Sequence, residues 1–467
     1  MNRPTLVSII AAVLLAAGPG MRGGVALAAS APVGPTSAQG QPAAAPAGAA
    51  LTFDQAIQQA LVRNPQVTAA QQALAAAQQG ITIARTGLEP TVSLNGNGNY
   101  GTASGTTVTS SGVAQVLPSA QGTGSVSFVG SVPLFDGGRT TAEVGSATAG
   151  VAIAEAALRL TEQSIALQTA TAFFNVLSAE TLTGVRQAQL KQNQDQLAQT
   201  QAQVKAGVAA QSDVIQVQSQ VAQAQVNLLS AQSQIATSKA ALQALLAADV
   251  AAPIEVQGPP APPTTVSVSS TTVVQQALAN RPEVAQAEAQ VQSAQSGLDL
   301  ARVNAGPQVS LAINTSYTPA STNSALSNAV SYGLGGTVSL PLFDSGKGRA
   351  EIDQAQATLQ SAQASLSAAQ LSVRQDAYQS YLSAVQAAAN LTATNAAAAA
   401  ADAALQVAQG QYRAGVGTIL NVTTAEANAA QAEVNAVSAV YSYQTALATL
   451  LHSEGLPIQS SALGGTQ

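Results

Sequence analysis

The sequence contains no cysteine, a single histidine and few charged side chains for its length of 467 residues. Without cysteine, the chain can form no disulfide, no thiolate metal site and no lipid attachment at an N-terminal cysteine. Charged residues make up 8% of the chain, whereas soluble domains usually carry about 25%. The net charge of −6 comes without a basic stripe, which argues against nucleic acid as a partner.

Residues that carry chemistry are equally scarce. The chain has one histidine, no phosphate-binding loop and no cluster of carboxylates on a shared predicted face, so it supports neither an enzyme nor a metal or cofactor site. Aromatic residues are 3% of the chain, and alanine supplies most of the hydrophobic share. Because large apolar side chains are few, thin layers of close-packed helices suit this chain better than a thick core.

The N-terminus predicts export from the cytoplasm. Arg3 precedes an apolar run from Leu6 to Ala17, and Ala26-Leu27-Ala28 offers a small-x-small cleavage site. This pattern predicts a signal peptide over residues 1–28. The alternative is an uncleaved anchor, but the run is too short to cross about 30 Å of hydrocarbon. The following segment, residues 29–50, is rich in Ala, Pro, Gly and Ser and is predicted to be disordered.

One stretch occurs twice and organises the rest of the chain. Ser131-Val-Pro-Leu-Phe-Asp-Gly-Gly-Arg139 returns as Ser339-Leu-Pro-Leu-Phe-Asp-Ser-Gly-Lys-Gly-Arg349. Each copy ends an alternating run and opens a long Ala/Gln-rich pattern, so Pro133/Asp136 and Pro341/Asp344 are predicted strand-to-helix joints. Phe343 follows Phe135 by 208 residues, and Gly415 follows Gly207 by the same 208. This constant offset indicates a tandem duplication.

Each predicted repeat has the order helix, β-hairpin, long helix, turn, helix. The first repeat covers residues 51–250 with its hairpin at 91–134, and the second covers 271–455 with its hairpin at 308–342. A Pro-rich linker at 251–270 is predicted to be extended, and residues 456–467 are predicted to be a flexible tail.

The hairpins show strict alternation of apolar and uncharged polar residues in runs of about ten, separated in the first hairpin by a predicted loop at 101–124. Such runs have the length of a tilted transmembrane β-strand, and their aromatics lie towards the run ends. The alternative is an ordinary hairpin with one wet face. Four strands cannot close a barrel, and open strand edges are not tolerated in hydrocarbon. An oligomer is therefore expected: two copies give eight strands, and three give twelve around a wet lumen.

The long helical patterns run from about 137 to 205 and from about 346 to 412, each about 100 Å at 1.5 Å per residue. The shorter helix after the first of them has a narrow apolar seam with alternating spacing of three and four, typical of a coiled coil. Its members are Val214, Val217, Val221, Ala224, Leu228, Ala231, Ile235, Ser238, Leu242 and Leu245.

The doubled Leu-Phe-Asp motif, the two Asn/Arg-Pro-x-Val openings and Tyr412-Arg-Ala-Gly-Val-Gly-Thr418 resemble the outer membrane efflux protein (TolC-like) family over residues 51–452. The resemblance implies a mixed, mainly α fold: a homotrimer with a twelve-stranded transmembrane β-barrel in outer-membrane lipid and a periplasmic α-barrel of coiled helices. It also implies a passive exit duct of a tripartite efflux or type I secretion system. The implied partners are a periplasmic adaptor (membrane fusion) protein and an inner-membrane pump of the resistance-nodulation-division or ATP-binding-cassette type.

The same resemblance assigns roles to individual residues. Family members often carry Asp beyond the second turn, where this chain has the aperture candidates Asn421 and Thr424, so we expect weak cation selectivity. Phe135 and Phe343 are predicted to anchor the barrel rim, with packing at the joint as the alternative. The periplasmic tip that docks the adaptor is assigned to Lys205, Gly207, Val208 and Asp213 in the first turn and to Arg413, Gly415, Val416 and Thr418 in the second.

Local structure offers alternatives at the tip. The two glycines suit a left-handed helix C-terminus, and Asp213 suits a helix cap. At the level of the whole chain, the rival hypothesis is a structural or adhesive coiled-coil protein of the cell envelope, anchored by a barrel. That function needs neither a second repeat nor a hollow tube, so the duplication favours the duct.

Overall fold

The structure is a computed structural model and describes residues 50–108, 110–112, 114–259, 266–318 and 329–463. The predicted signal peptide and residues 29–49 lie outside the described residues, as do residues 260–265 of the predicted linker and the last four residues of the predicted tail. The unit that begins at Ala50 is described below.

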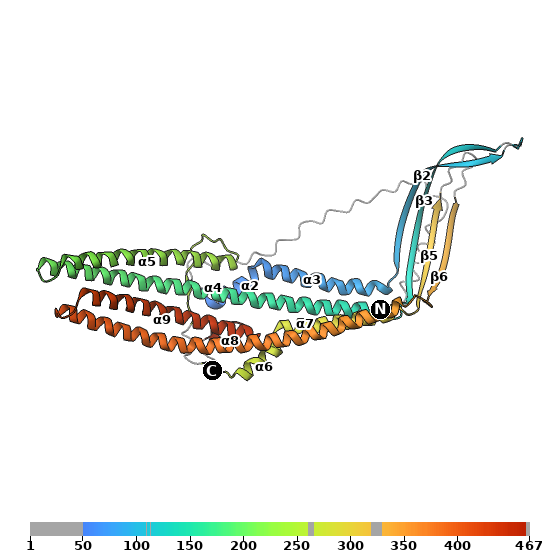
Figure 1. Ribbon diagram of the computed structural model, residues 1–467. Coiled ribbons are helices and arrows are strands. Elements are labelled where there is room, and N and C mark those ends of the chain that lie inside the picture. Colours follow the sequence, from blue (N-terminus) through green and yellow to red (C-terminus); the bar gives the residue numbers. More distant parts are fainter. Residues whose placement is uncertain (1–49, 109, 113, 260–265, 319–328, 464–467) are drawn as a thin grey trace. The chain divides into compact units, whose positions relative to one another are not determined.

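Apart from a short 3₁₀ helix in the first half and a short C-terminal helix in the second, the two halves of this unit contain the same elements in the same order (Figure 1). The first half comprises β1 (Leu51–Thr52), α2 (Phe53–Arg63), α3 (Pro65–Arg85), the 3₁₀ helix η1 (Thr86–Leu88), β2 (Thr91–Val108), β3 (Ala114–Phe135), α4 (Arg139–Lys205) and α5 (Gln211–Leu245). The second comprises β4 (Val256–Gln257), α6 (Ser270–Asn280), α7 (Pro282–Asn304), β5 (Gln308–Thr318), β6 (Ala329–Ser339), α8 (Lys347–Arg413), α9 (Ile419–Ser453) and α10 (Ser460–Leu463).

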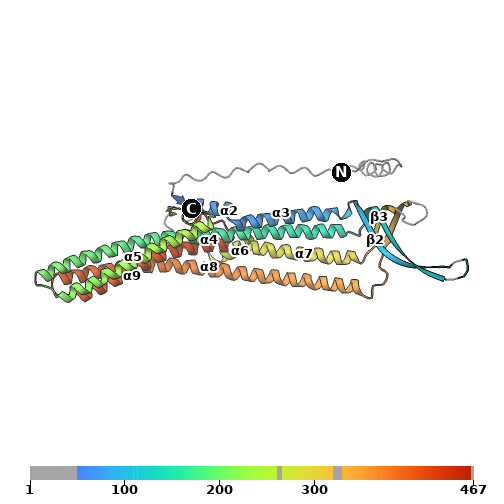
Figure 2. The same ribbon diagram turned by 90° about the horizontal axis from the view of Figure 1, so that it is seen from above.

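Corresponding helices after the hairpins match in length and keep the 208-residue offset. α4 and α8 have 67 residues each, and α5 and α9 have 35 each. Each long helix packs along its shorter partner, α4 with α5 and α8 with α9, and α4 also contacts α9 (Figures 1 and 2). The structure therefore holds two similar helical hairpins side by side.

The strands form one antiparallel sheet with the order β2-β3-β5-β6. The hairpin β2/β3 is longer than its sequence predicts, because pairing continues in register to Val108 opposite Ala114. The predicted loop at 101–124 is therefore wrong. Threonine and valine recur in this stretch and favour an extended backbone, and the glycines between them do not stop the pairing.

The strand-to-helix joints form as predicted. Asp136 accepts hydrogen bonds from the backbone N–H groups of Gly138 (2.9 Å) and Thr140 (2.7 Å). Asp344 accepts the equivalent bonds from Gly346 (3.0 Å) and Gly348 (2.6 Å). Each carboxylate thus satisfies N–H groups that the start of a long helix would otherwise leave without partners.

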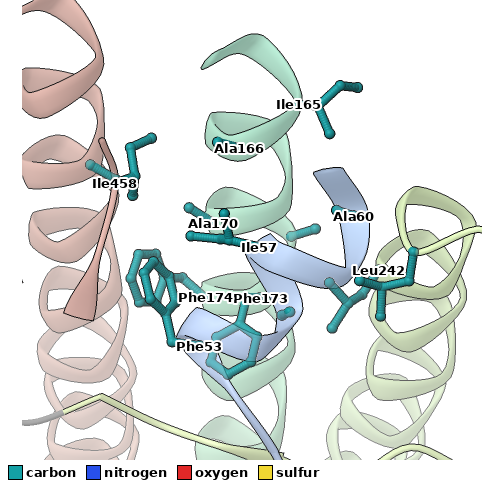
Figure 3. Packing of buried hydrophobic residues seen from close by; sticks show 14 of the residues in the cluster. Phe53, Ile57, Ala60, Ile165, Ala166, Ala170, Phe173, Phe174, Leu242 and Ile458 are labelled. Atoms are coloured by element: carbon teal, nitrogen blue, oxygen red, sulfur yellow. The ribbon is translucent and has the colours of Figure 1, made fainter. Parts of the chain in front are cut away.

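The largest apolar cluster lies where α2 packs against the middle of α4 (Figure 3). Phe53 stacks on Phe174 with ring centroids 5.2 Å apart and meets Phe173 edge-on at 5.5 Å. Ile458 and Leu463 are buried in the same cluster, and the Ser460 N–H donates to the Asp54 carboxylate at 2.8 Å. The predicted flexible tail is therefore wrong for residues 456–463, because two apolar side chains hold it against the core.

The predicted seam of α5 is confirmed, since each of its ten members is buried or half-buried. No helix among the described residues is long and apolar enough to cross a membrane.

Candidate functional site

The turn after α4 is built by a glycine that ends the helix. Gly207 has φ +75, and no atom lies within 4 Å of the place where a Cβ would stand. The Gly207 N–H donates to the Val204 carbonyl and the Val208 N–H to the Gln203 carbonyl, both at 3.0 Å. This is a Schellman motif, which needs a left-handed residue. The left-handed backbone conformation, and not crowding, therefore favours glycine at this position.

The turn after α8 repeats this geometry. Gly415 has φ +76, its N–H donates to the Tyr412 carbonyl, and the Val416 N–H donates to the Gln411 carbonyl, both at 3.0 Å. The next helix, α9, begins after Thr418, whose hydroxyl accepts a hydrogen bond from the Asn421 N–H at 3.3 Å. The local alternative for the two glycines is thus correct, and the assignment of both turns to adaptor docking stays a prediction.

Asp213 does not cap α5. The N-cap is Ala210, which makes no side-chain capping bond, and Asp213 lies in the first helical turn. There its carboxylate interacts favourably with the helix dipole and accepts a hydrogen bond from the Ser212 hydroxyl at 3.4 Å. The cap interpretation is therefore wrong, because the helix already begins at Gln211, before Asp213 is reached.

Both turns expose an apolar side chain at the end of the helices. Val208 is 76% exposed and Val416 is 80% exposed. The other residues assigned to the tip, apart from the half-buried Asp213, are exposed as well, and so are the aperture candidates. These exposed residues are Lys205, Gly207, Arg413, Gly415, Thr418, Asn421 and Thr424.

The two turns lie next to each other. Val217 of α5 packs with Ile419 and Val422 of α9 in one buried cluster, which Leu197 of α4 and Tyr412 of α8 border. The structure thus brings the tip residues of both repeats together at one end of four helices. We call the residues from 189 to 220 and from 408 to 430 the tip bundle.

Behind the apolar cluster, the tip bundle contains buried polar residues. Gln196 and Thr200 of α4 and Thr423 of α9 are almost fully buried. Glu426 of α9 is only 7% exposed, and neither of its carboxylate oxygens has a hydrogen-bond partner among the described residues. Burial raises the pKa of Glu426 to about 7, against a smaller lowering effect of Gln409.

Glu426 is a site residue that the sequence prediction missed. The signal was its spacing, since Ile419, Val422 and Glu426 follow each other at intervals of three and four and so lie on one helix face. A carboxylate on an apolar helix face is a position where a perturbed pKa is expected.

The proposed rim residues lie at the other end of the long helices. Phe135 ends β3 and is 51% exposed, and Phe343 precedes α8 and is 88% exposed. Because Phe343 is so exposed, it packs little against the strand-to-helix joint, and its ring could contact lipid at the rim of a barrel. Among the described residues, no group of three or more His, Asp or Glu side chains is placed to hold a metal ion.

Comparisons with known proteins agree with this geometry. A family model described as outer membrane efflux protein matches residues 56–248 and 273–455. No curated protein matched the sequence. Among solved structures, CusC aligns with a TM-score of 0.73 at 19% identity, over 86% of this chain and 92% of that one. The outer-membrane channel OprN gives 0.72 at 20% over 86% and 89%. The open state of the Neisseria gonorrhoeae MtrE outer membrane channel gives 0.68 at 21% over 87% and 89%.

Proposed function

Because the chain belongs to the outer membrane efflux protein family, we propose that it is the passive, trimeric exit duct of a tripartite efflux or type I secretion system. Family membership indicates an efflux channel of the outer membrane. The finer parts of the proposal are the number of copies, the periplasmic tunnel, and the adaptor and pump that load it.

The observation that carries the proposal is a helix face that is covered in one repeat and bare in the other. Within the chain, α9 contacts α4, and Val434 and Val437 of α9 are half-buried. Their equivalents in α5, displaced by 208 residues, are Val226 and Leu229, which are 56% and 65% exposed. Among the described residues, the duplicated helix α5 thus leaves the equivalent apolar side chains largely uncovered.

The long helices show the complementary difference. Ala170 and Phe174 of α4 are fully buried in a cluster to which α2 and α9 both contribute, whereas their α8 equivalents, Tyr378 and Leu382, are 48% and 46% exposed. If α8 of one copy meets α5 of the next as α4 meets α9 within the chain, both bare faces are covered. Repetition of that contact generates a closed ring of helical hairpins.

The sheet requires the same kind of assembly. Within the chain, β2 and β6 each have one neighbour in the four-stranded sheet, so a second copy is needed to pair their free edges. Val92 and Leu94 of β2 are 69% and 62% exposed, and Tyr332 and Leu334 of β6 are 64% and 71% exposed. Three copies supply twelve strands, which is the number that the family resemblance implies.

The tip bundle is the proposed entrance and docking surface. Val208 and Val416 give each repeat an exposed apolar contact for the adaptor, whose inner-membrane pump supplies the energy. We expect Val208→Asp and Val416→Asp to abolish cross-linking to the adaptor in cells while leaving the trimer intact. Val62→Asp is the matched control, because Val62 is a valine of similar exposure, 71%, on α2.

Conductance in planar lipid bilayers tests the duct itself. The proposal predicts stable pores from purified protein with weak cation selectivity, since Asn421 and Thr424 carry no charge. Protein that assembles but forms no pores would exclude the duct and favour the barrel-anchored structural or adhesive protein.

A further inference from the structure

One face of α9 connects the two helical hairpins through polar contacts. The Gln216 side chain of α5 donates to the Thr423 hydroxyl at 3.3 Å. Further along, the Gln189 side chain of α4 donates to the Ala430 carbonyl at 3.3 Å. Residues 423, 426 and 430 lie on one helix face, so Glu426 lies between these two contacts on the side of α9 that meets the other hairpin. Gln409 of α8, in its own hairpin, is also close enough to affect its pKa.

The described surroundings of Glu426 offer its carboxylate no opposite charge. It is buried and forms no ion pair among the described residues, and the polar side chain that lowers its pKa is the uncharged Gln409 of α8. A buried, unpaired carboxylate is costly, whereas a neutral carboxyl group fits. The titratable side chains on the four packed helices near this level are Lys191, Asp195 and Lys205 of α4, Asp213 of α5, Asp402, Tyr412 and Arg413 of α8, and Glu433 of α9, and none of them pairs with Glu426.

We propose that Glu426 is a proton-controlled contact between the hairpins: the packed tip bundle requires its neutral carboxyl group, and ionisation loosens α9 from α4 and α5 and favours an open tip. The inference rests on the proposed function, in which the tip bundle is the entrance of the duct.

The proposed trimer has two kinds of junction between helical hairpins: α9 against α4 and α5 within a chain, and α8 against α5 of the next copy. The duplication places the Glu426 contact only at the first kind. The residue of α5 equivalent to Glu426 is Gln218, 208 positions earlier. Gln196 and Thr200 of α4 correspond to Ala404 and Ala408 of α8. The junction that α8 is proposed to form with α5 of the next copy therefore lacks both the carboxyl group and the buried polar residues of α4. A trimer would carry three proton-controlled junctions and three that lack this buried carboxyl group.

The direction of the effect follows from the burial. The pKa of Glu426 is about 7 in the packed state, above the ordinary value of about 4.3 for an exposed glutamate. The packed state is thus fully favoured below about pH 4, loses stability as the pH rises from about 4 to 7, and loses little more above 7. Between pH 6 and pH 8, the protonated fraction falls about tenfold.

Spin labels at the two turns give a direct readout, because the chain has no native cysteine. Cysteines replace Val208 and Val416, and the distance distribution between the labels is measured at pH 6, 7 and 8 in the assembled protein. We expect the fraction of separated tips to rise severalfold across this range, with the larger part of the rise between pH 6 and pH 7. Glu426→Gln, which carries the residue found at position 218, abolishes the rise. Glu433→Gln, at an exposed glutamate two turns further along α9, retains it.

Two results overturn the inference: an unchanged distance distribution in the wild type between pH 6 and pH 8, or a wild-type response in Glu426→Gln. The wild-type measurement alone can refute the inference, so the test remains valid even if Glu426→Gln does not assemble. Bilayer conductance on the same samples separates this inference from the duct. Pores without pH dependence refute the contact alone, whereas a pH-dependent tip without pores refutes the duct alone.

Discussion

A charge on the bare face of α5 should prevent assembly. Leu229 is 65% exposed on the face whose α9 equivalent meets α4 inside the chain. Burying a whole leucine contributes about 1.5–3 kcal/mol, so covering the exposed part contributes about 1–2 kcal/mol in each copy. Across three interfaces, Leu229→Glu removes about 3–6 kcal/mol, and desolvation of the new carboxylates adds a further penalty.

At about 1.4 kcal/mol for each factor of ten, the loss weakens the trimer by at least about a hundredfold. Light scattering of detergent-purified protein over a range of concentrations measures this directly. Gln234→Glu introduces the same charge at an exposed residue of α5 that lies about 140° around the helix from Leu229, and it should assemble as the wild type does. If Leu229→Glu also assembles normally, the proposed contact between α5 and α8 of neighbouring copies is wrong.

Other substitutions test separate parts of the account. Phe173→Ala leaves a cavity in the aromatic cluster and should destabilise the fold by about 3–5 kcal/mol, which would lower the midpoint of thermal unfolding. An unchanged midpoint would contradict the packing of α2 against α4. Asp136→Ala should cost about 1 kcal/mol through loss of the helix cap. Burial raises the pKa of Asp136, but hydrogen bonds from Thr140 and Gly138 lower it more, so the capping contribution is present at neutral pH and is lost as the pH falls below about 4. Asn421→Asp should increase cation selectivity, and reversal potentials that do not change would remove Asn421 from the aperture.

Features set by local spacing could be predicted from the sequence. The seam of α5 follows from intervals of three and four between small apolar residues, and the caps at Asp136 and Asp344 follow from a carboxylate placed close before glycine. The constant offset between repeats located both turns, because each repeat places a glycine, the residue that best tolerates a left-handed conformation, where its long helix ends.

Features set by long-range contacts could not be predicted in this way. The hairpin β2/β3 continues through a Gly/Ser/Thr stretch because each strand pairs with the other, which composition alone does not reveal. Residues 456–463 are held by Ile458 and Leu463, which are buried against α2 and α4. These two helices belong to the first repeat and are far from the tail in the sequence. Glu426 is buried where the helices of the tip bundle pack together, so its raised pKa is a property of the folded bundle.

The most direct test of the duct is electron microscopy of the detergent-purified protein. The account predicts hollow particles with threefold symmetry, in which a helical tube extends for about 100 Å from a short barrel. Monomers, dimers or solid rods under conditions in which the protein is folded would contradict it, because the exposed faces of α5 and α8 would then not pack against each other in a closed trimer.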